Sequence, residues 1–335
     1  MLPYKEFKEE IRTYLEQEFG DGHDVDIFRF RKANTGIQDS ITIFEKGNRE
    51  KHISPQIYLK PLYLKYKEGM TMQEIKEAVV SQYREGLKGA EFFMESMPDI
   101  GNYEKCMGRL YFRPVGTERN RMLLKKVPHR EVLDLSFVPY ILIRESEKET
   151  CSAMVNNTMV KNWGIPEEAV LKQAFVNMPK IMPAKADTMK SLVETVLEVA
   201  ADNRNGGDTT DIMEAAKEMA AVSGMLSGTG KFPRPFILTN KKGINGFAAV
   251  FYPGVLKDAA DMIGKNLFVL PSSIHESLLV ADDGSVRAAE LRRMVREVNA
   301  GCVAEEEIVS DSVYFYDRKE GKLSMAKEEE LCAGF

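Results

Sequence analysis

The sequence lacks the features of membrane-spanning and secreted proteins. Its longest apolar stretch, residues 135–143, contains a serine and a proline, whereas a membrane-spanning helix needs ~20 apolar residues. The N-terminal residues are charged from position 5 onward and no apolar segment follows them, so we expect no signal peptide. We therefore expect a cytoplasmic location and no membrane partner.

Cysteine and histidine are scarce, with four residues of each. The cysteines are widely spaced and include no CxxC pair, which predicts single thiols in a reducing compartment rather than a zinc ribbon. The histidines show neither HExxH nor HxxxH spacing, so we expect no helix-mounted pair of metal ligands. The phosphate-binding pattern GxxxxGK[ST] is missing as well. We predict neither a metal nor a cofactor.

No sign of charge dominates the chain. Lys and Arg number 46 against 51 Asp and Glu, which gives a net charge of −5, and the two signs are interspersed. Nucleic-acid binding draws most of its affinity from basic residues that neutralise phosphates, so we expect no nucleic-acid partner. The basic run at 119–127 is interpreted as the solvated face of a short helix, with a phosphate-binding strip as the alternative.

What is present is the patterning of a globular chain, with 44% hydrophobic residues. The first hundred residues predict an N-terminal α/β portion over 1–100. Its expected elements are an amphipathic helix at 4–18, a hairpin of strands at 26–31 and 40–45, a helix that opens at Pro61, and a helix that opens at the capping box Thr71–Glu74 and runs to about 87.

Residues 101–335 predict the main body of the protein, in which strands and helices alternate irregularly. Such an order is typical of an α+β fold with an antiparallel or mixed sheet and flanking helices. Strands are expected at 109–113, 131–144, 151–155, 236–239, 246–251, 266–270, 274–280 and 312–316, and helices at 118–125, 156–163, 166–177, 253–263 and 286–299. Pro139 implies that the strand at 131–144 is an edge strand or contains a bulge.

The composition shifts between residues 180 and 232. Helical periodicity there is interrupted by segments rich in Gly, Asn, Asp, Ser and Thr. We interpret this region as a helical insertion, with its helices near 185–228 and mobile loops at 202–210 and 224–232.

Several segments together resemble a known family. They occur in the order ITIFEK, ISPQIYLKPLYLKYKEG, VPHREVLDLSFVPYIL, NNTMVKNWGI, FILTNKKGINGFAAVFYPGVL, LFVLPSSIHESLLV and SDSVYFYDRKEG. As a set they resemble an uncharacterised domain-of-unknown-function family of clostridia-type Firmicutes, over most of the chain and least at 180–232. The resemblance implies a bacterial cytoplasmic setting and no known activity.

The segment 270–277, LPSSIHES, carries the most suggestive group of polar side chains. Ser273, His275 and Glu276 offer a hydroxyl, an imidazole and a carboxylate. In an extended strand, Ser273 and His275 would share a face at ~6.5 Å and Glu276 would point to the opposite face. A Ser–His–acid relay needs contacts of ~2.6–3.2 Å, which neighbours in one strand cannot supply. The simpler interpretation is a turn at 271–273 followed by a hydrogen-bonded histidine in a sheet.

A second group lies at 128–134, where Glu131 could orient His129. If the strand that follows lay beside the strand of His275, two histidines and two carboxylates could converge into an acid/base or metal site. The alternative is an exposed strand entrance with surface ion pairs.

Two functions remain open from the sequence. The first is a non-catalytic binding or adaptor protein with a protein or small-molecule partner of unknown identity, because no catalytic signature is assembled. The second is a hydrolase or transferase that uses His275 and His129 with nearby carboxylates.

Overall fold

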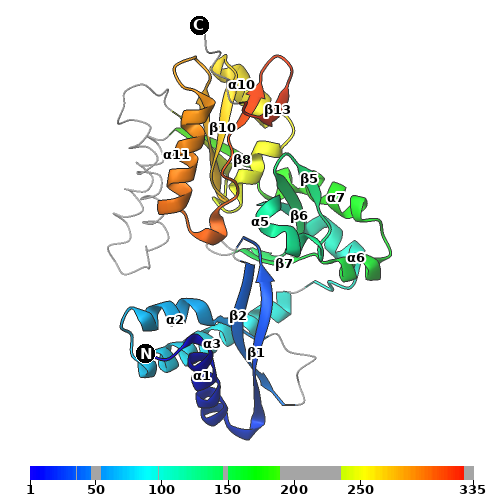
Figure 1. The fold of residues 1–335 in the computed structure, drawn as a ribbon. Helices are drawn as coiled ribbons and strands as arrows, with labels where there is room; N and C mark the ends of the chain where they lie inside the picture. The colour runs from blue at the N-terminus through cyan, green and yellow to red at the C-terminus, as the bar shows by residue number, and fades with distance from the viewer. Residues whose placement is uncertain (35, 47–53, 97, 146–149, 189–234, 328–335) are drawn as a thin grey trace, which may run out of the picture. The chain divides into compact units, whose positions relative to one another are not determined.

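The structure is a computed structural model that describes residues 1–34, 36–46, 54–96, 98–145, 150–188 and 235–327. It divides into two compact units, Met1–Ile100 and Gly101–Phe335 (Figure 1). Helices combine with antiparallel sheets, so the predicted α+β class is confirmed. In these ranges no helix is long and apolar enough to cross a membrane.

The first unit packs three helices against one face of a small sheet. Its elements are α1 (Tyr4–Phe19), η1 (Gly20–Gly22), β1 (His23–Lys32), β2 (Gly36–Glu45), β3 (Ile57–Tyr58), α2 (Leu59–Lys67) and α3 (Met72–Ser96). The strand order is β1-β2-β3. Phe7, Ile11 and Leu15 of α1 are fully buried, so the apolar stripe of the sequence is the buried face of the helix.

The starts of α3 and α2 can be compared with the starts that the sequence predicts. The capping box is present, because Glu74 accepts the Thr71 backbone N–H at 2.8 Å and Thr71 Oγ1 accepts that of Glu74 at 3.3 Å. The prediction that a helix opens at Pro61 is wrong by two residues, since α2 begins at Leu59. A proline is tolerated there because the first N–H groups of a helix have no intrahelical acceptor.

The second unit contains a four-stranded and a six-stranded sheet. It begins with α4 (Tyr103–Cys106), η2 (Met107–Arg109), β4 (Leu110–Gly116), α5 (Thr117–Leu124), β5 (Arg130–Val132), β6 (Leu135–Glu145), β7 (Thr150–Met154), α6 (Asn157–Trp163), α7 (Glu167–Ile181) and β8 (Ala184–Thr188). It continues with β9 (Phe236–Asn240), η4 (Gly246–Phe251), α10 (Val255–Ile263), β10 (Leu267–Ser273), β11 (Glu276–Ala281), α11 (Ala288–Gly301), η5 (Glu305–Glu307), β12 (Tyr314–Asp317) and β13 (Lys322–Met325).

The four-stranded sheet corrects the strand predicted at 131–144. That segment is a hairpin, β5 and β6, which turns at Leu133 with φ 59°. Alternation alone could not indicate this turn, because leucine rarely adopts a positive φ. The sheet has the order β4-β6-β5, and β7 also pairs with β6, so β6 is central.

Two prolines lie within this sheet against expectation. Pro139 is neither at an edge nor at the register shift, which falls between Leu142 and Arg144. Its backbone faces the gap between β5 and β7, where its carbonyl accepts the N–H of Val155 at 3.0 Å, so no ladder bond is lost. The strand predicted at 109–113 continues through Pro114 to Gly116, because β4 is an edge strand and tolerates a proline.

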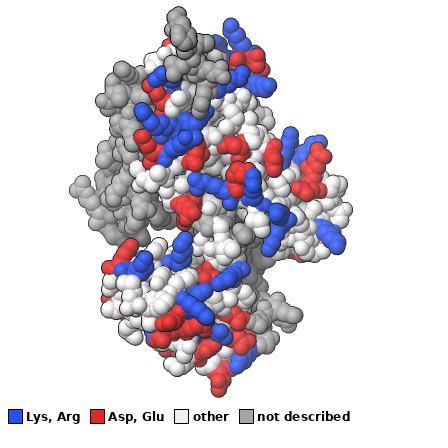
Figure 2. Space-filling view, in the orientation of Figure 1, with Lys and Arg blue, Asp and Glu red and all other residues white. Residues whose placement is uncertain are grey.

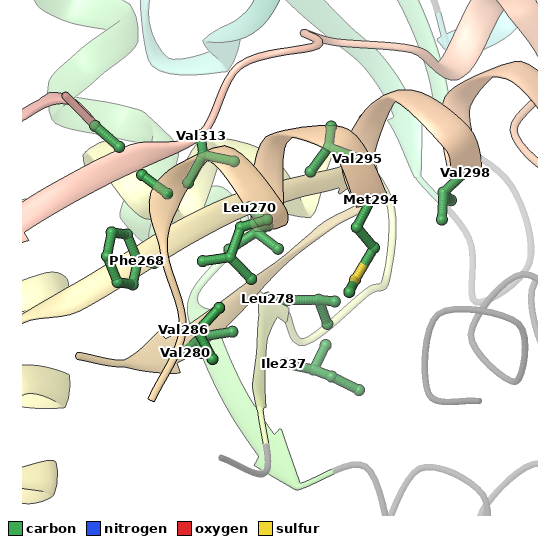
Figure 3. Close-up of a cluster of buried hydrophobic side chains, with 13 residues drawn as sticks. Ile237, Phe268, Leu270, Leu278, Val280, Val286, Met294, Val295, Val298 and Val313 are labelled. Atoms are coloured by element: carbon green, nitrogen blue, oxygen red, sulfur yellow. The ribbon is translucent and has the colours of Figure 1, made fainter. Parts of the chain in front are cut away.

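The six-stranded sheet has the order β13-β12-β10-β11-β9-β8. Helix α11 covers one face, where Met294, Val295 and Val298 lie over strand residues such as Leu270 and Leu278 (Figure 3). These helix residues recur at the spacing of an amphipathic helix, in the segment predicted as helical at 286–299. β13 was not predicted.

The segment Gly246–Phe251 was predicted as a strand, and this is wrong, because it forms the 3₁₀ helix η4. Phe247 lies 6.4 Å, ring to ring, from Tyr314 of one sheet, and Phe251 lies 4.7 Å from Phe137 of the other. A segment buried on all sides reads as a continuous apolar run, whose periodicity cannot separate strand from helix.

The start of the predicted helical insertion is a strand, not a helix. Residues 184–188 form β8, an edge strand paired antiparallel with β9. The remainder of the predicted insertion, with both predicted mobile loops, falls in 189–234 and lies outside the described residues.

Candidate functional site

Three of the predicted site residues lie at the hairpin of β10 and β11. Ser273 and Glu276 are register partners, and His275 lies in the two-residue turn between them. The predicted turn at 271–273 and strand from 274 are therefore wrong. Segments distant in sequence hold the turn, since Ile274 donates its N–H to the Glu307 carbonyl at 2.9 Å and accepts that of Phe247 at 3.2 Å.

The His275 ring has a partner at each nitrogen. Nδ1 lies 3.3 Å from the backbone N–H of Asn245, which can only donate, so Nδ1 accepts. The ring proton is therefore assigned to Nε2, which lies 3.4 Å from Oε1 of Glu307. Ser273 Oγ accepts the backbone N–H of His275 at 3.0 Å. In a Ser–His–acid relay, the ring nitrogen that does not face the acid accepts the proton of the nucleophile. In His275 that nitrogen is Nδ1, and it already accepts a backbone N–H.

Two carboxyl groups flank this turn in different environments. Burial raises the pKa of Glu276, and a hydrogen bond from Ser272 at 3.2 Å offsets part of this increase. The hydrogen bond from His275 lowers the pKa of Glu307. Pairs of carboxyl groups with pKa values displaced in opposite directions occur in acid/base catalysis, so this is the feature that favours an enzyme.

His129 lies before β5 in a different network. Its backbone N–H donates to Glu167 at 2.8 Å, and its Nδ1 donates to the Val127 carbonyl at 3.1 Å. Its Nε2 is 4.0 Å from Glu131, whose side chain is exposed. Within the ranges the structure describes, His129 and His275 have no polar partner in common.

A group that the sequence did not reveal lies on the four-stranded sheet. We call it the Arg113 site, and it consists of Tyr111 and Arg113 of β4, Tyr140 of β6 and Ser152 of β7. The Tyr111 hydroxyl accepts from Arg113 Nε at 3.0 Å and Nη2 at 2.6 Å, and Ser152 Oγ accepts from Nη2 at 2.7 Å. The guanidinium lies 4.2 Å from the centre of the Tyr140 ring, which is cation–π distance.

The charge of the Arg113 site is unbalanced. Arg113 is half-buried, and no described carboxylate lies within ion-pair distance of it. Burial raises the pKa of Tyr140, although the Arg113 charge offsets part of this increase, so the phenol stays neutral. The site therefore carries one net positive charge among neutral hydroxyl groups.

Sequence reasoning missed this site for a definable reason. The spacing Tyr111-x-Arg113 places both residues on one face of a strand. Tyr140 and Ser152 join them only through the register of β4 with β6 and of β6 with β7. One sequence does not reveal that register.

Neither surface charge on the face drawn in Figure 2 nor metal-ligand side chains among the described residues indicate a further site. On that face, basic and acidic side chains lie next to one another. The described residues contain no group of three His, Cys, Asp or Glu side chains that could hold a metal ion.

The model of DUF5688, a family of unknown function, matches residues 4–318. The chain belongs to this family. Comparison with curated proteins gives no match, and neither does comparison with solved structures. The DUF5688 match includes the Arg113 site, His129 and the His275 turn.

Proposed function

We propose that this DUF5688 protein is a non-catalytic binding protein of the bacterial cytoplasm that binds an anionic group at the Arg113 site. The observation that carries the proposal is the half-buried guanidinium of Arg113, which has aromatic and hydroxyl partners but no acidic one among the described residues.

The energetics of a half-buried charge support a ligand. Removing a charged group fully from water without a counter-charge costs several kcal/mol, and half-burial costs a part of this. A cation–π contact returns about 0.5–2 kcal/mol, and hydrogen bonds to neutral hydroxyls replace only part of the lost hydration. A bound anion would supply the missing counter-charge.

The cytoplasmic and bacterial settings rest on separate grounds. Cys302 is a free thiol, which is typical of proteins from a reducing compartment. The bacterial setting is the one that the family resemblance implies.

Thermal unfolding in the presence of small anions tests the proposal. We expect acetate, benzoate or phosphate to raise the melting temperature of the wild type in a saturable way, as any ligand specific to the native state does. Arg113→Gln should abolish the effect. Arg130→Gln removes the same charge from an exposed residue on the opposite face of the sheet and should keep it. An equal response of the wild type and Arg113→Gln to every anion would refute the proposal.

The alternative function is a hydrolase or transferase at the His275 turn. The opposite pKa displacements of Glu276 and Glu307 favour it. The backbone amide on Nδ1 of His275 weighs against it, because the ring then lacks a free position for a nucleophile.

A further inference from the structure

We infer that the anion taken by the Arg113 site is a carboxylate. This inference rests on the proposed function and narrows it to one ligand chemistry. It follows from the hydrogen bonds that the site has already used, the donors that remain, and the net charge.

Arg113 retains at least one free N–H donor. A guanidinium has five N–H donors, and three of the Arg113 donors are used by Nε and Nη2 toward Tyr111 and Ser152. The Tyr140 side chain is a further hydrogen-bond partner of Arg113, so at least one N–H group remains. The Nε and Nη2 groups, which could otherwise bind an anion through two parallel hydrogen bonds, already donate to Tyr111 and Ser152.

The Ser152 hydroxyl adds a donor beside Arg113. It accepts from Nη2 and has its own proton to donate, for which the described part of the chain offers no acceptor. The Tyr111 hydroxyl accepts two hydrogen bonds from Arg113, but Tyr111 is fully buried, so it positions the guanidinium and does not contact a ligand.

A carboxylate fits this set of donors. It has two oxygens with about four lone pairs, all of them acceptors, and it forms charge-assisted hydrogen bonds with arginine. Its single negative charge balances the one guanidinium. A phosphate or sulfate dianion would leave an excess negative charge beside the buried rings of Tyr111 and Tyr140.

The carboxylate could come from a small organic acid or from a protein chain. Benzoate and acetate probe the first source. A short peptide probes the second, when it is compared with the same peptide amidated at its C-terminus. Binding of benzoate but not of the free peptide would identify a small-molecule site.

Calorimetric titration at constant ionic strength tests the inference, with benzoate, acetate, the two peptides, phosphate and sulfate as probes. We expect at least one carboxylate probe to bind the wild type about tenfold more tightly than phosphate or sulfate. Arg113→Gln should weaken that binding about tenfold or more, because a charged hydrogen bond is lost. Ser152→Ala should weaken it about threefold or more, and Arg130→Gln should leave it unchanged.

Two different results would overturn two different claims. Tighter binding of phosphate or sulfate, abolished by Arg113→Gln, would refute the carboxylate and leave the proposed anion-binding function intact. Binding of no probe, or binding indifferent to both Arg113→Gln and Ser152→Ala, would refute the proposed function itself. Circular dichroism and melting temperature establish that each variant is folded. If Arg113→Gln does not fold, the binding measured for Ser152→Ala tests both claims.

Discussion

Asp39 shows how one buried charge depends on its neighbours. Its Oδ2 lies 2.7 Å from Lys8 Nζ and its Oδ1 lies 3.0 Å from Arg29 Nε. Burial on its own raises the pKa of Asp39, but the hydrogen bonds and charges of Lys8 and Arg29 outweigh burial and lower it. The side chains of Lys8 and Asp39 are only 11% and 10% exposed, and Lys8 depends on Asp39 for its counter-charge, whereas Asp39 also has Arg29.

Asp39→Asn should therefore destabilise the protein. The change leaves Lys8 buried without a full counter-charge, which costs about 3 kcal/mol of unfolding free energy at pH 7. Glu16→Gln is the control, because Glu16 pairs with Arg12 on an exposed helix face and should change stability by about 0.5 kcal/mol or less. Urea denaturation measures both variants, and equal losses would contradict the prediction.

The same pair predicts a pH dependence. A carboxyl whose pKa is lower in the folded state stabilises the fold above its unfolded pKa, which is about 3.9 for aspartate. That stability is lost as the pH falls below about 4 and through the folded pKa of Asp39. The gap in stability between the wild type and Asp39→Asn should narrow over this range, since asparagine does not titrate.

Position 246 has no room for a side chain larger than that of glycine. A Cβ there would overlap Oγ1 of Thr239 and the carbonyl oxygen of His275. Gly246→Ala should cost about 2 kcal/mol of unfolding free energy, because backbone atoms would have to move. Gly301→Ala is the control, since a Cβ there meets nothing within 4 Å. An unchanged melting temperature for Gly246→Ala would contradict the packing around η4.

At the scale of elements, the β10–β11 turn offers a test that separates structure from chemistry. The ring of His275 accepts the N–H of the buried residue Asn245, and glutamine cannot keep this bond and the contact with Glu307 in the same geometry. His275→Gln should lower stability by about 1–3 kcal/mol, with anion binding at the Arg113 site unchanged.

The alternative enzyme function predicts a different outcome for His275→Gln. Loss of a hydrolase or transferase activity with an unchanged melting temperature would make His275 a functional residue. Measuring thermal unfolding and hydrolase or transferase activity on the same preparation distinguishes the two outcomes.

The sequence predicted those elements whose signals are local. The stripe of α1, the capping box of α3 and the N-cap of α6, where Asn156 accepts the N–H of Met159 at 2.9 Å, each involve residues within four positions of one another. The failures at η4 and in the turn at His275 share a cause. Partners from distant segments fix the backbone there and override local preference.

For the candidate sites too, the sequence predicted local groups of residues but not contacts between distant segments. The sequence identified Ser273, His275 and Glu276 because they are adjacent in it, but it could not indicate Glu307, the partner of the His275 ring. It could not indicate the Arg113 site at all, because three strands contribute to it. The missing information is strand register for the Arg113 site, and the packing of η5 against the β10–β11 turn for Glu307.

At the scale of the molecule, we expect residues 1–100 to fold alone. Their core, which includes Phe7, Ile41, Leu59 and Val79, consists of residues from this unit. Expressed separately, the segment should unfold cooperatively in urea and give dispersed amide resonances. A spectrum typical of an unfolded chain would show that the boundary at residue 100 does not delimit an autonomous domain.

The pairing of β8 with β9 has a consequence for engineering the protein. Thr188 is the register partner of Phe236, so the chain leaves the six-stranded sheet and returns to it at adjacent backbone positions. Because these two flanking residues are paired, an Asn-Gly turn that replaces residues 189–235 should close the β8–β9 pair and preserve cooperative unfolding of the remaining protein. Loss of the cooperative transition would show that the sheet needs more than this closure. If the transition is preserved, the β8–β9 junction is a graft point, at which a foreign domain with neighbouring termini could be inserted without disturbing the register of the host sheet.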